Sequence, residues 1–391
     1  MLPPIAPQRA APLTKTWKRP LWRRVVRWAI RGIAIVIALP IVALVIGYLR
    51  SDNECSRPKQ APAHPMRAIV YCDYGTADNL RLEPVEKPTP TDDQMLVKVK
   101  SAAVNPLDWH FIRGTPYVMR LSAGLKKPKD IRLGVDFSGT VEAVGKNVTD
   151  FKPGDDIFGG RNGAFAEYVV VRPDRAITPK PANVSFEQAA GVPIAGITAL
   201  QAIRDRAKLQ PGQKVLINGA SGGVGTFAVQ IAKAYGADVT GVCSGRNVEM
   251  VRGLGADRVI DYTKEDFTKG DARYDAIIDN VGNRGLLECK RVLAPNGRYV
   301  LIGGGGPDRG NWIGALAGPM KAFMLGAFVK QEMGFFVAQL NKADLKVLAD
   351  MMEAGQVTPV IDRTYPLAEV PEAIKYLEEG HARGKVVTTM E

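Results

Sequence analysis

Metal-binding side chains are few in this sequence and poorly spaced for a metal site. Its 391 residues include three histidines and four cysteines. The cysteines lie far apart and no two of them form a C-x-x-C pair, which argues against both a zinc knuckle and a framework of disulfides. We therefore predict no bound metal, and free thiols in a reducing compartment at Cys55, Cys72, Cys243 and Cys289.

An excess of charge of one sign is also nearly absent from the body of the chain. Lys and Arg exceed Asp and Glu by 52 to 40 overall, but residues 1–67 hold twelve basic and two acidic side chains. The remaining residues carry 40 basic and 38 acidic side chains. A nucleic-acid-binding domain needs a basic stripe on its folded surface, so we predict no nucleic-acid partner.

One long uncharged run does occur, at residues 32–49. As a helix it would extend about 27 Å and nearly match the hydrocarbon core of a bilayer. Arginines precede it, and Trp28 and Tyr48 flank it, where aromatic rings favour the membrane interface. We expect an uncleaved transmembrane helix over about residues 30–49. A cleaved export signal, suggested by twin arginines, and a buried helix are the alternatives.

A dense group of glycines lies in the middle of the chain. "GASGGVG", residues 219–225, follows the apolar run "KVLIN" and precedes the helical pattern of "TFAVQIAKAY". Its glycines have G-x-x-G-x-x-G spacing, a variant of the dinucleotide-binding fingerprint. Such a turn brings backbone N–H groups close to a pyrophosphate at the positive end of a helix. The pattern predicts a dinucleotide site.

Further strand patterns follow the glycine turn and alternate with helical stretches. This rhythm is typical of a doubly wound parallel sheet, whose ligands bind at the carboxyl ends of the strands. The predicted strands after the one at residues 214–218 cover residues 238–243, 258–262, 276–281 and 298–304.

The end of the second strand indicates which dinucleotide is bound. An NAD site places Asp or Glu there to accept hydrogen bonds from the ribose 2′-OH. This chain has "CSGRN" instead, in which the Arg246 guanidinium can pair with a 2′-phosphate. The sequence therefore favours NADPH, with a merely solvated Arg246 as the alternative.

The chain from residue 66 to residue 391 is similar to a known superfamily in several blocks that occur in the same order. They include "NPLDWHFIRG", "GVDFSGTVEAVGKNV", "GAFAEYVVV", "VLINGASGGVG", "VIDYTKEDF" and "GHARGKVV". These blocks resemble the medium-chain dehydrogenase/reductase superfamily, and most of all its zinc-independent quinone oxidoreductase branch, which includes zeta-crystallin.

The resemblance implies an α/β fold in which a Rossmann doubly wound parallel sheet is inserted into a GroES-like β-barrel domain. The barrel domain would comprise residues 66–187 and 341–391, and the NADPH-binding Rossmann domain residues 188–340. Residues 1–65 lie outside the resemblance. They would form a basic segment, the transmembrane helix and a linker.

The resemblance also implies which positions surround the cofactor. The glycine turn would hold the pyrophosphate, the end of the second strand and a following tyrosine the 2′-phosphate, and later strand ends the nicotinamide half. The implied cofactor-binding residues are Thr198, Ala220, Ser221, Gly222, Gly223, Val224, Gly225, Ser244, Arg246, Tyr262, Asn280, Ile302, Gly303 and Lys385.

The sequence departs from the zinc-dependent members of the superfamily at two ligand positions. Those members place Cys where this chain has Asn105, and Gly-His-Glu where it has "GVD" at residues 134–136. A catalytic zinc needs about three converging protein ligands. The histidines at positions 64 and 381 fall in the linker and in the C-terminal block, so we predict no zinc.

A site without such ligands favours reductive chemistry. Hydride addition to a quinone or to an activated C=C bond produces a delocalised anion, which does not need the alkoxide stabilisation that zinc supplies to alcohol dehydrogenases. We predict Asn105 as a polar contact of the acceptor and His110 as a donor to the developing oxyanion. The alternative for His110 is a structural role. We expect Asp108 to accept hydrogen bonds from local backbone N–H groups.

The sequence thus predicts a membrane-anchored, zinc-independent NADPH-dependent reductase of quinones or enones. The alternative is a non-catalytic nucleotide-binding or interaction protein on the same fold. The resemblance implies a homodimer. Basic residues before the span favour a catalytic domain outside the cytoplasm, whereas the supply of NADPH favours the cytoplasmic side, so both orientations stay open.

Overall fold

The computed structural model describes residues 45–56, 61–303 and 329–390, together with isolated positions between residues 28 and 43. The chain divides into two units, Met1–Arg50 and Ser51–Glu391. In the first unit residues 45–49 are helical. Within the described part of the chain, no helix combines the length and the apolar character needed to span a bilayer. Half of the predicted span over residues 30–49 lies outside the described residues.

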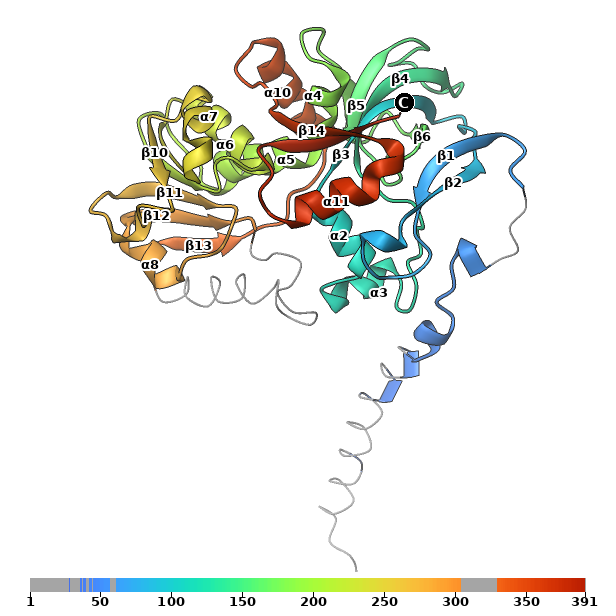
Figure 1. The fold of residues 1–391 in the computed structure, drawn as a ribbon, viewed down its shortest axis with the longest axis horizontal. Helices are drawn as coiled ribbons and strands as arrows, with labels where there is room; N and C mark the ends of the chain where they lie inside the picture. The colour runs from blue at the N-terminus through green and yellow to red at the C-terminus, as the bar shows by residue number, and fades with distance from the viewer. Residues whose placement is uncertain are drawn as a thin grey trace, which may run out of the picture. The chain divides into compact units, whose positions relative to one another are not determined.

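Six parallel strands form the first sheet of the unit Ser51–Glu391, in the spatial order β10-β9-β8-β11-β12-β13. The predicted doubly wound parallel sheet is therefore confirmed (Figure 1). Strands β8 and β9 occupy the predicted ranges, and the next three overlap theirs. The bounds are β8 Lys214–Asn218, β9 Asp238–Cys243, β10 Arg258–Asp261, β11 Tyr274–Asp279, β12 Leu293–Leu301 and β13 Glu332–Phe335.

Apolar cores on both faces of this sheet explain why its strands read as uninterrupted hydrophobic runs. In β8, Val215 and Ile217 belong to one core and Leu216 to the other. Helices α5 and α6 pack on the first face, and α8 contributes Cys289 to the second. The helices of this part are α5 Pro193–Gln201, α6 Gly223–Ala234, α7 Val248–Gly253 and α8 Leu286–Arg291.

A second, mainly antiparallel sheet forms the barrel, in the order β14-β15-β3-β4-β5-β7 with β6 paired to β3. Strand β1 pairs with β2 in a separate hairpin. The bounds are β1 Pro65–Val70, β2 Arg81–Glu86, β3 Met95–Val104, β4 Asp136–Val144, β5 Asp156–Gly160, β6 Tyr168–Val171, β7 Ile177–Pro179, β14 Ile361–Pro366 and β15 Lys385–Thr389. Its helices are α2 Pro106–Arg113, α3 Arg120–Ala123, α4 Phe186–Ala190, α10 Lys342–Glu353 and α11 Val370–Glu378.

The last strand of the chain returns to the barrel with which the unit begins. Strand β15 runs antiparallel to β3, with Val386 opposite Val104 and Thr389 opposite Ser101. Figure 1 shows the strands β10–β13 on one side of the unit and β1–β6 on the other. Strand β15 pairs with β3 of the latter group. The barrel is thus built from two separated stretches of chain. Helix α10 packs with the Rossmann core through Leu345 and Leu348, and the exact domain limits stay a prediction.

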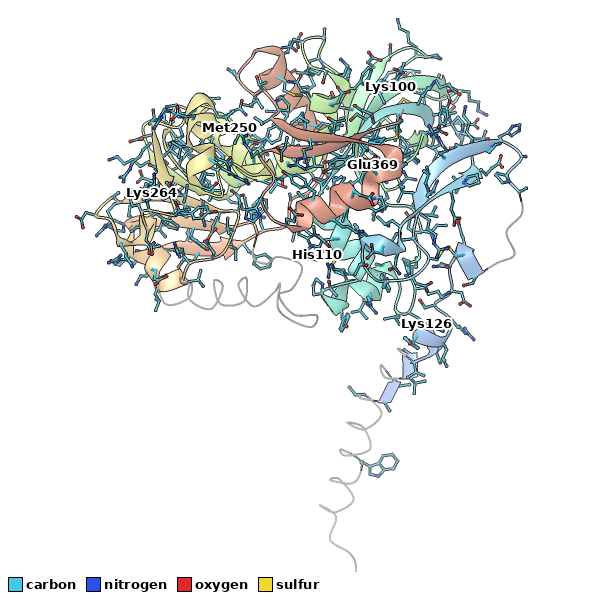
Figure 2. The ribbon with its side chains drawn as sticks, in the orientation of Figure 1. Lys100, His110, Lys126, Met250, Lys264 and Glu369 are labelled. Carbon is cyan, nitrogen blue, oxygen red and sulfur yellow. A yellow bond between two sulfur atoms is a disulfide. The ribbon has the colours of Figure 1, made fainter. Side chains whose placement is uncertain are left out.

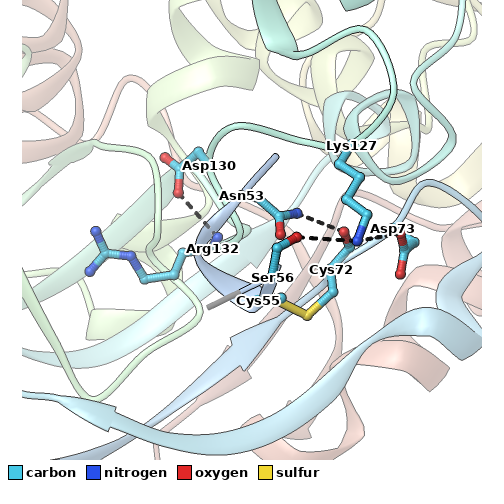
Figure 3. Close-up of a disulfide and its surroundings, with 8 residues drawn as sticks. All are labelled: Asn53, Cys55, Ser56, Cys72, Asp73, Lys127, Asp130 and Arg132. Carbon is cyan, nitrogen blue, oxygen red and sulfur yellow. Dashed lines mark hydrogen bonds and ion pairs between the residues drawn. A yellow bond between two sulfur atoms is a disulfide. The ribbon is translucent and has the colours of Figure 1, made fainter. Parts of the chain in front are cut away.

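Two of the four cysteines are joined, so the prediction of four free thiols was wrong. Cys55 and Cys72, 17 residues apart, form a disulfide (Figure 3), while Cys243 and Cys289 are free and buried. Asn53 Nδ2 donates to the carbonyl oxygen of Cys72 at 2.7 Å and holds the two segments together. Their proximity depends on a fold that the spacing of the cysteines did not reveal.

Reduction of this disulfide is expected to destabilise the unit Ser51–Glu391. A bridge that closes a loop of this length stabilises a protein by about 3 kcal/mol, chiefly by restricting the unfolded chain. Chemical unfolding with and without dithiothreitol measures the difference. The variant Cys55→Ser/Cys72→Ser should show the reduced stability and no response to dithiothreitol. Equal stability of the reduced and oxidised wild type would contradict the role of this bond.

Candidate functional site

The glycine turn joins the end of β8 to the start of α6, as predicted. Gly219 has a φ of +76°, a conformation that favours glycine. A Cβ at Gly225 would lie 2.1 Å from the carbonyl oxygen of Gly219, so this glycine permits close packing of the turn on the helix. Gly222 is the N-cap, and the first N–H groups of α6 lack partners within the helix. The turn therefore presents these N–H groups at the positive end of a helix.

The C-terminal part of the barrel contacts this turn. The N–H of Gly384 donates to the carbonyl oxygen of Ser221 at 2.9 Å, and Gly384 forms a parallel bridge with Gly222. The side chain of the next residue, Lys385, packs against Gly223. A Cβ added to Gly223 would lie 3.2 Å from Lys385 Cδ. The start of β15 is therefore fixed against the predicted pyrophosphate site.

The predicted 2′-phosphate residues lie at neighbouring strand ends. Ser244 follows β9, and the N–H of Tyr262, after β10, donates to the carbonyl oxygen of Cys243 at 3.0 Å. Arg246 is exposed and donates from Nη2 to the carbonyl oxygen of His381 at 2.8 Å. No other hydrogen bond holds its guanidinium in the described ranges. This group can accordingly reach an anion on the surface.

Asn247, which was not predicted as a site residue, connects the glycine turn to the end of β9. Its Nδ2 atom lies 3.0 Å from Ser221 Oγ and 3.2 Å from Ser244 Oγ, and both hydroxyl oxygens accept. Its Oδ1 atom is buried and has no hydrogen-bond partner among the residues that the structure describes. An Asn just before a helix was the available signal, and it indicated only a cap. Asp261, another missed residue, lies against Gly245 and accepts bonds from Thr263.

The residues expected near the nicotinamide half lie at two further strand ends and on α5. Gly303, after β12, packs so closely that a Cβ would lie 2.1 Å from the carbonyl oxygen of Asn280. Asn280 donates from Nδ2 to the carbonyl oxygen of Asn218, and its Oδ1 atom is buried without a partner in the described part of the chain. Thr198 Oγ donates to the carbonyl oxygen of Ile194. A bound carboxamide or hydroxyl would satisfy the orphaned Asn280 oxygen.

A buried cluster of polar side chains lies where β3, β4, α2 and β15 meet. Asn105 is 1% exposed, and Lys385 Nζ lies 2.5 Å from its Oδ1 atom. Asn105 Nδ2 donates to Asp136 Oδ2 at 3.0 Å and to the carbonyl oxygen of Ala103 at 3.2 Å. All the hydrogen-bonding atoms of this amide are therefore engaged within the protein. The cluster holds Asn105 in place, and its predicted direct contact with an acceptor stays a prediction.

Asp108 bonds the local backbone, as predicted. Its Oδ2 atom accepts the N–H of Asn105 at 2.7 Å. Burial raises the pKa of this carboxyl to about 7, although its backbone hydrogen bonds oppose the shift. Burial likewise raises the pKa of Asp136 to about 6, and the nearby Lys385 ammonium opposes the change. Burial lowers the pKa of Lys385, against the effect of both carboxylates.

His110 lies on α2 (Figure 2), and its Nδ1 atom is 2.8 Å from the carbonyl oxygen of Thr115. Since a carbonyl oxygen only accepts, Nδ1 carries the hydrogen and Nε2 of the neutral ring is an acceptor. Burial lowers the pKa of His110, so the neutral form predominates at pH 7. The geometry therefore favours an accepting Nε2, and the predicted role as a proton donor requires the imidazolium form.

The substitution Asp108→Asn is expected to stabilise the protein increasingly as the pH rises. The pKa of Asp108 is about 7 in the folded state, above the ordinary value of 3.8 for an aspartate side chain. Its contribution to stability is therefore full below pH 4 and is lost as the pH rises through 7. Asparagine keeps an acceptor for the N–H of Asn105 and does not ionise. From pH 4 to pH 8, the unfolding free energy of the variant should gain on the order of 3 kcal/mol relative to the wild type. If the unfolding free energies of the variant and the wild type change with pH in parallel, the raised pKa of Asp108 is contradicted.

No group of three His, Cys, Asp or Glu side chains within the described ranges is arranged to hold a metal ion. Two ranges of the chain match known families, one of which is named for zinc binding. Residues 91–182 match the alcohol dehydrogenase GroES-like domain, and residues 254–388 match a family described as zinc-binding dehydrogenase. The first match lies in the barrel. The second runs from the Rossmann part to β15 of the barrel.

Several proteins of similar sequence align with most of the length of this chain. A mitochondrial NAD(P)H oxidoreductase of Mus musculus is 36% identical over 327 residues, covering 76% of this chain and 82% of that protein. A chloroplastic NADPH-dependent alkenal/one oxidoreductase of Arabidopsis thaliana is 34% identical, covering 85% and 81%. The solved structure of a quinone oxidoreductase from Coxiella burnetii is 31% identical, covers 84% of this chain and 100% of its own, and superposes with a TM-score of 0.73.

Proposed function

Because the chain belongs to the zinc-independent quinone oxidoreductase branch of the medium-chain dehydrogenase/reductase superfamily, we propose that it reduces a quinone or an α,β-unsaturated carbonyl compound with NADPH. The observation that carries this proposal is the glycine turn at the start of α6, with Arg246 exposed at the end of the neighbouring strand. One feature suits a pyrophosphate and the other a 2′-phosphate. Relatives named for alkenal/one and for quinone reduction support both acceptor classes.

The residues present fit this cofactor. The first N–H groups of α6 would hold the pyrophosphate, Ser244, Arg246 and Tyr262 the adenosine end, and Asn280 the nicotinamide end. The orphaned Oδ1 atoms of Asn280 and Asn247 are acceptors that a ligand can satisfy. When bound, the cofactor supplies hydride. The protein contributes orientation and exclusion of water, which are effective when donor and acceptor are held in contact.

The acceptor must stabilise the charge that hydride addition creates. In a quinone or an enone the charge spreads onto the carbonyl oxygen, so a hydrogen bond there is sufficient and a strong Lewis acid is not required. Neutral His110 presents Nε2 as a hydrogen-bond acceptor. We propose that Nε2 accepts a hydrogen bond from a hydroxyl of the cofactor or from a water, which in turn donates to the carbonyl oxygen of the substrate. A water held in this way would pass one proton to this oxygen and regain it from bulk solvent, so that one hydride and one solvent proton together complete the reduction.

Turnover by the full-length chain in detergent tests the proposal. Steady-state oxidation of NADPH should depend on a quinone or a 2-alkenal, and NADH should serve less well. NADP⁺ with primary or secondary alcohols should give no reaction. Binding of NADPH without turnover on any acceptor would favour the alternative, a non-catalytic nucleotide-binding protein. Failure to bind NADPH would contradict both functions.

We further propose that residues 30–49 anchor the protein in a membrane, where apolar quinone-like acceptors partition. Basic residues before this segment and the Cys55–Cys72 disulfide favour an oxidising compartment for the unit Ser51–Glu391, whereas NADPH supply favours the cytoplasm. Resistance to alkaline carbonate extraction tests the anchor. Protease protection of the unit in sealed vesicles reports its side. Release of the intact chain by carbonate would contradict the anchor.

A further inference from the structure

A lysine ammonium and two carboxylates share one buried place in the barrel, which is unusual because charges are costly to remove from water. Asp108 and Asp136 are fully buried, and Lys385 is 4% exposed. Removing such charges in favour of apolar side chains often leaves stability unchanged or improved. Stability alone therefore gives little reason for this arrangement, and its connections suggest another role.

Lys385 runs from the glycine turn into the barrel. Its stem passes two glycines, and added Cβ atoms would lie 3.3 Å from its Cγ at Gly191 and 3.2 Å from its Cδ at Gly223. Its ammonium ends in the cluster, 3.3 Å from the carbonyl oxygen of Val104 and 3.9 Å from Asp136 Oδ2. The charged end therefore points into the barrel, while the stem stays against the first turn of α6.

Asp136 connects three elements that carry predicted site residues. Its Oδ2 atom accepts from Asn105 Nδ2 and lies near the Lys385 ammonium. Its Oδ1 atom accepts the N–H of Ile194 at 3.1 Å, at the start of α5, the helix that bears Thr198. One carboxylate thus holds the start of β15, the N-cap of α2 and the start of α5.

We propose that Asp136 is a positioning residue for hydride transfer, which acts through Lys385 and the start of α5 to fix the barrel against the dinucleotide turn. This inference rests on the proposed function. Lys385 carries the effect to the turn, because the adjacent Gly384 bonds Ser221. The helix α5 carries it to the predicted nicotinamide side. Without the carboxylate, the turn can still bind a dinucleotide. The barrel residues beside the predicted nicotinamide position are then held less accurately.

The neighbouring charges agree with this role. Asp108 also faces the Lys385 ammonium, and burial raises its pKa to about 7, above that of Asp136. Asp136 forms an ion pair with Lys385, with 3.9 Å between Oδ2 and Nζ, and is therefore the carboxylate that balances this ammonium. The substitution Asp136→Asn removes this balance and keeps the side-chain volume.

Kinetics of Asp136→Asn and Asp136→Glu test the proposal, with Asp344→Asn as the matched control. Asp344 is also buried, at 5% exposure, but it bonds Gln201 at the opposite end of α5 from Ile194, together with Arg204 and Asn341. Within the described part of the chain, it has no hydrogen bond to the turn or to the cluster. Asp136→Asn should lower kcat about 10- to 100-fold and change the Kd for NADPH less than threefold. Asp136→Glu should recover part of kcat. Asp344→Asn should lower thermal stability and leave kcat unchanged.

Two outcomes would overturn the inference. One is a kcat for Asp136→Asn that equals that of the wild type, or a fall in kcat that Asp344→Asn reproduces at an equal loss of thermal stability. The other is a rise in Kd as large as the fall in kcat, which would make Asp136 a binding residue. A wild type that shows no turnover would instead contradict the proposed function. Hydrogen exchange of residues 219–225 then still tests the positioning role, since exchange should be faster in Asp136→Asn and an unchanged rate would contradict it.

Discussion

Replacing Gly222 with alanine is expected to weaken NADPH binding about 100-fold and to leave the free protein as stable as the wild type. Gly222 has φ −85° and ψ 179°, a conformation that alanine adopts readily. An added Cβ would have one protein neighbour within 4 Å, the carbonyl oxygen of Gly219 at 3.5 Å. The methyl group would instead occupy the space through which a pyrophosphate reaches the first N–H groups of α6.

Calorimetry with NADPH and thermal unfolding separate these two effects. The matched control is Gly253→Ala at the end of α7, where an added Cβ meets nothing within 4 Å and lies away from the turn, so its affinity should be unchanged. Gly225→Ala should lose stability as well as affinity, because its Cβ would strike backbone atoms. Unaltered NADPH affinity in Gly222→Ala would mean that the pyrophosphate does not lie on this turn.

Replacing Arg246 with glutamate is expected to lower the affinity for NADPH about 100-fold and to change that for NADH less than threefold. A guanidinium that pairs with a phosphate contributes about 1.5–3 kcal/mol, and a carboxylate in its place adds repulsion. The contact of Arg246 with the carbonyl oxygen of His381 is exposed, so its loss should cost little stability. The ratio of the two dissociation constants measures the preference.

The charge-reversed control lies six residues further along the chain. Arg252 is 58% exposed and pairs with Glu249 on α7, so Arg252→Glu changes the net charge by the same amount without entering the predicted phosphate site. Both cofactors should bind this variant as they bind the wild type. If Arg246→Glu binds NADPH normally, the assignment of the 2′-phosphate to this arginine is wrong.

The strands of the Rossmann sheet were predictable because their signals are local. "KVLIN" is apolar on both faces, and the turn that follows it needs glycine for reasons visible in the sequence itself. The split barrel was expected only from the resemblance. No local pattern indicates that Lys385 forms a hydrogen bond with Asn105, because 280 residues separate them in the sequence.

The buried cluster also shows what residue type alone does not reveal. Asn105 was expected to face the acceptor because it stands where relatives carry a metal ligand. The structure engages its amide with Lys385, Asp136 and the backbone. Asp136 itself was noted only as a departure from a metal-binding pattern. Its importance depends on contacts with three elements that come together in the folded chain.

The fate of the hydride tests the central claim most directly. NADPH deuterated at the transferred position of the nicotinamide should be incubated with the full-length protein and an α,β-unsaturated ketone, and the product analysed by mass spectrometry and NMR. The account predicts a saturated ketone with one deuterium at the β-carbon. A reduced product without this deuterium, or the absence of reduction of any quinone or enone, would contradict it.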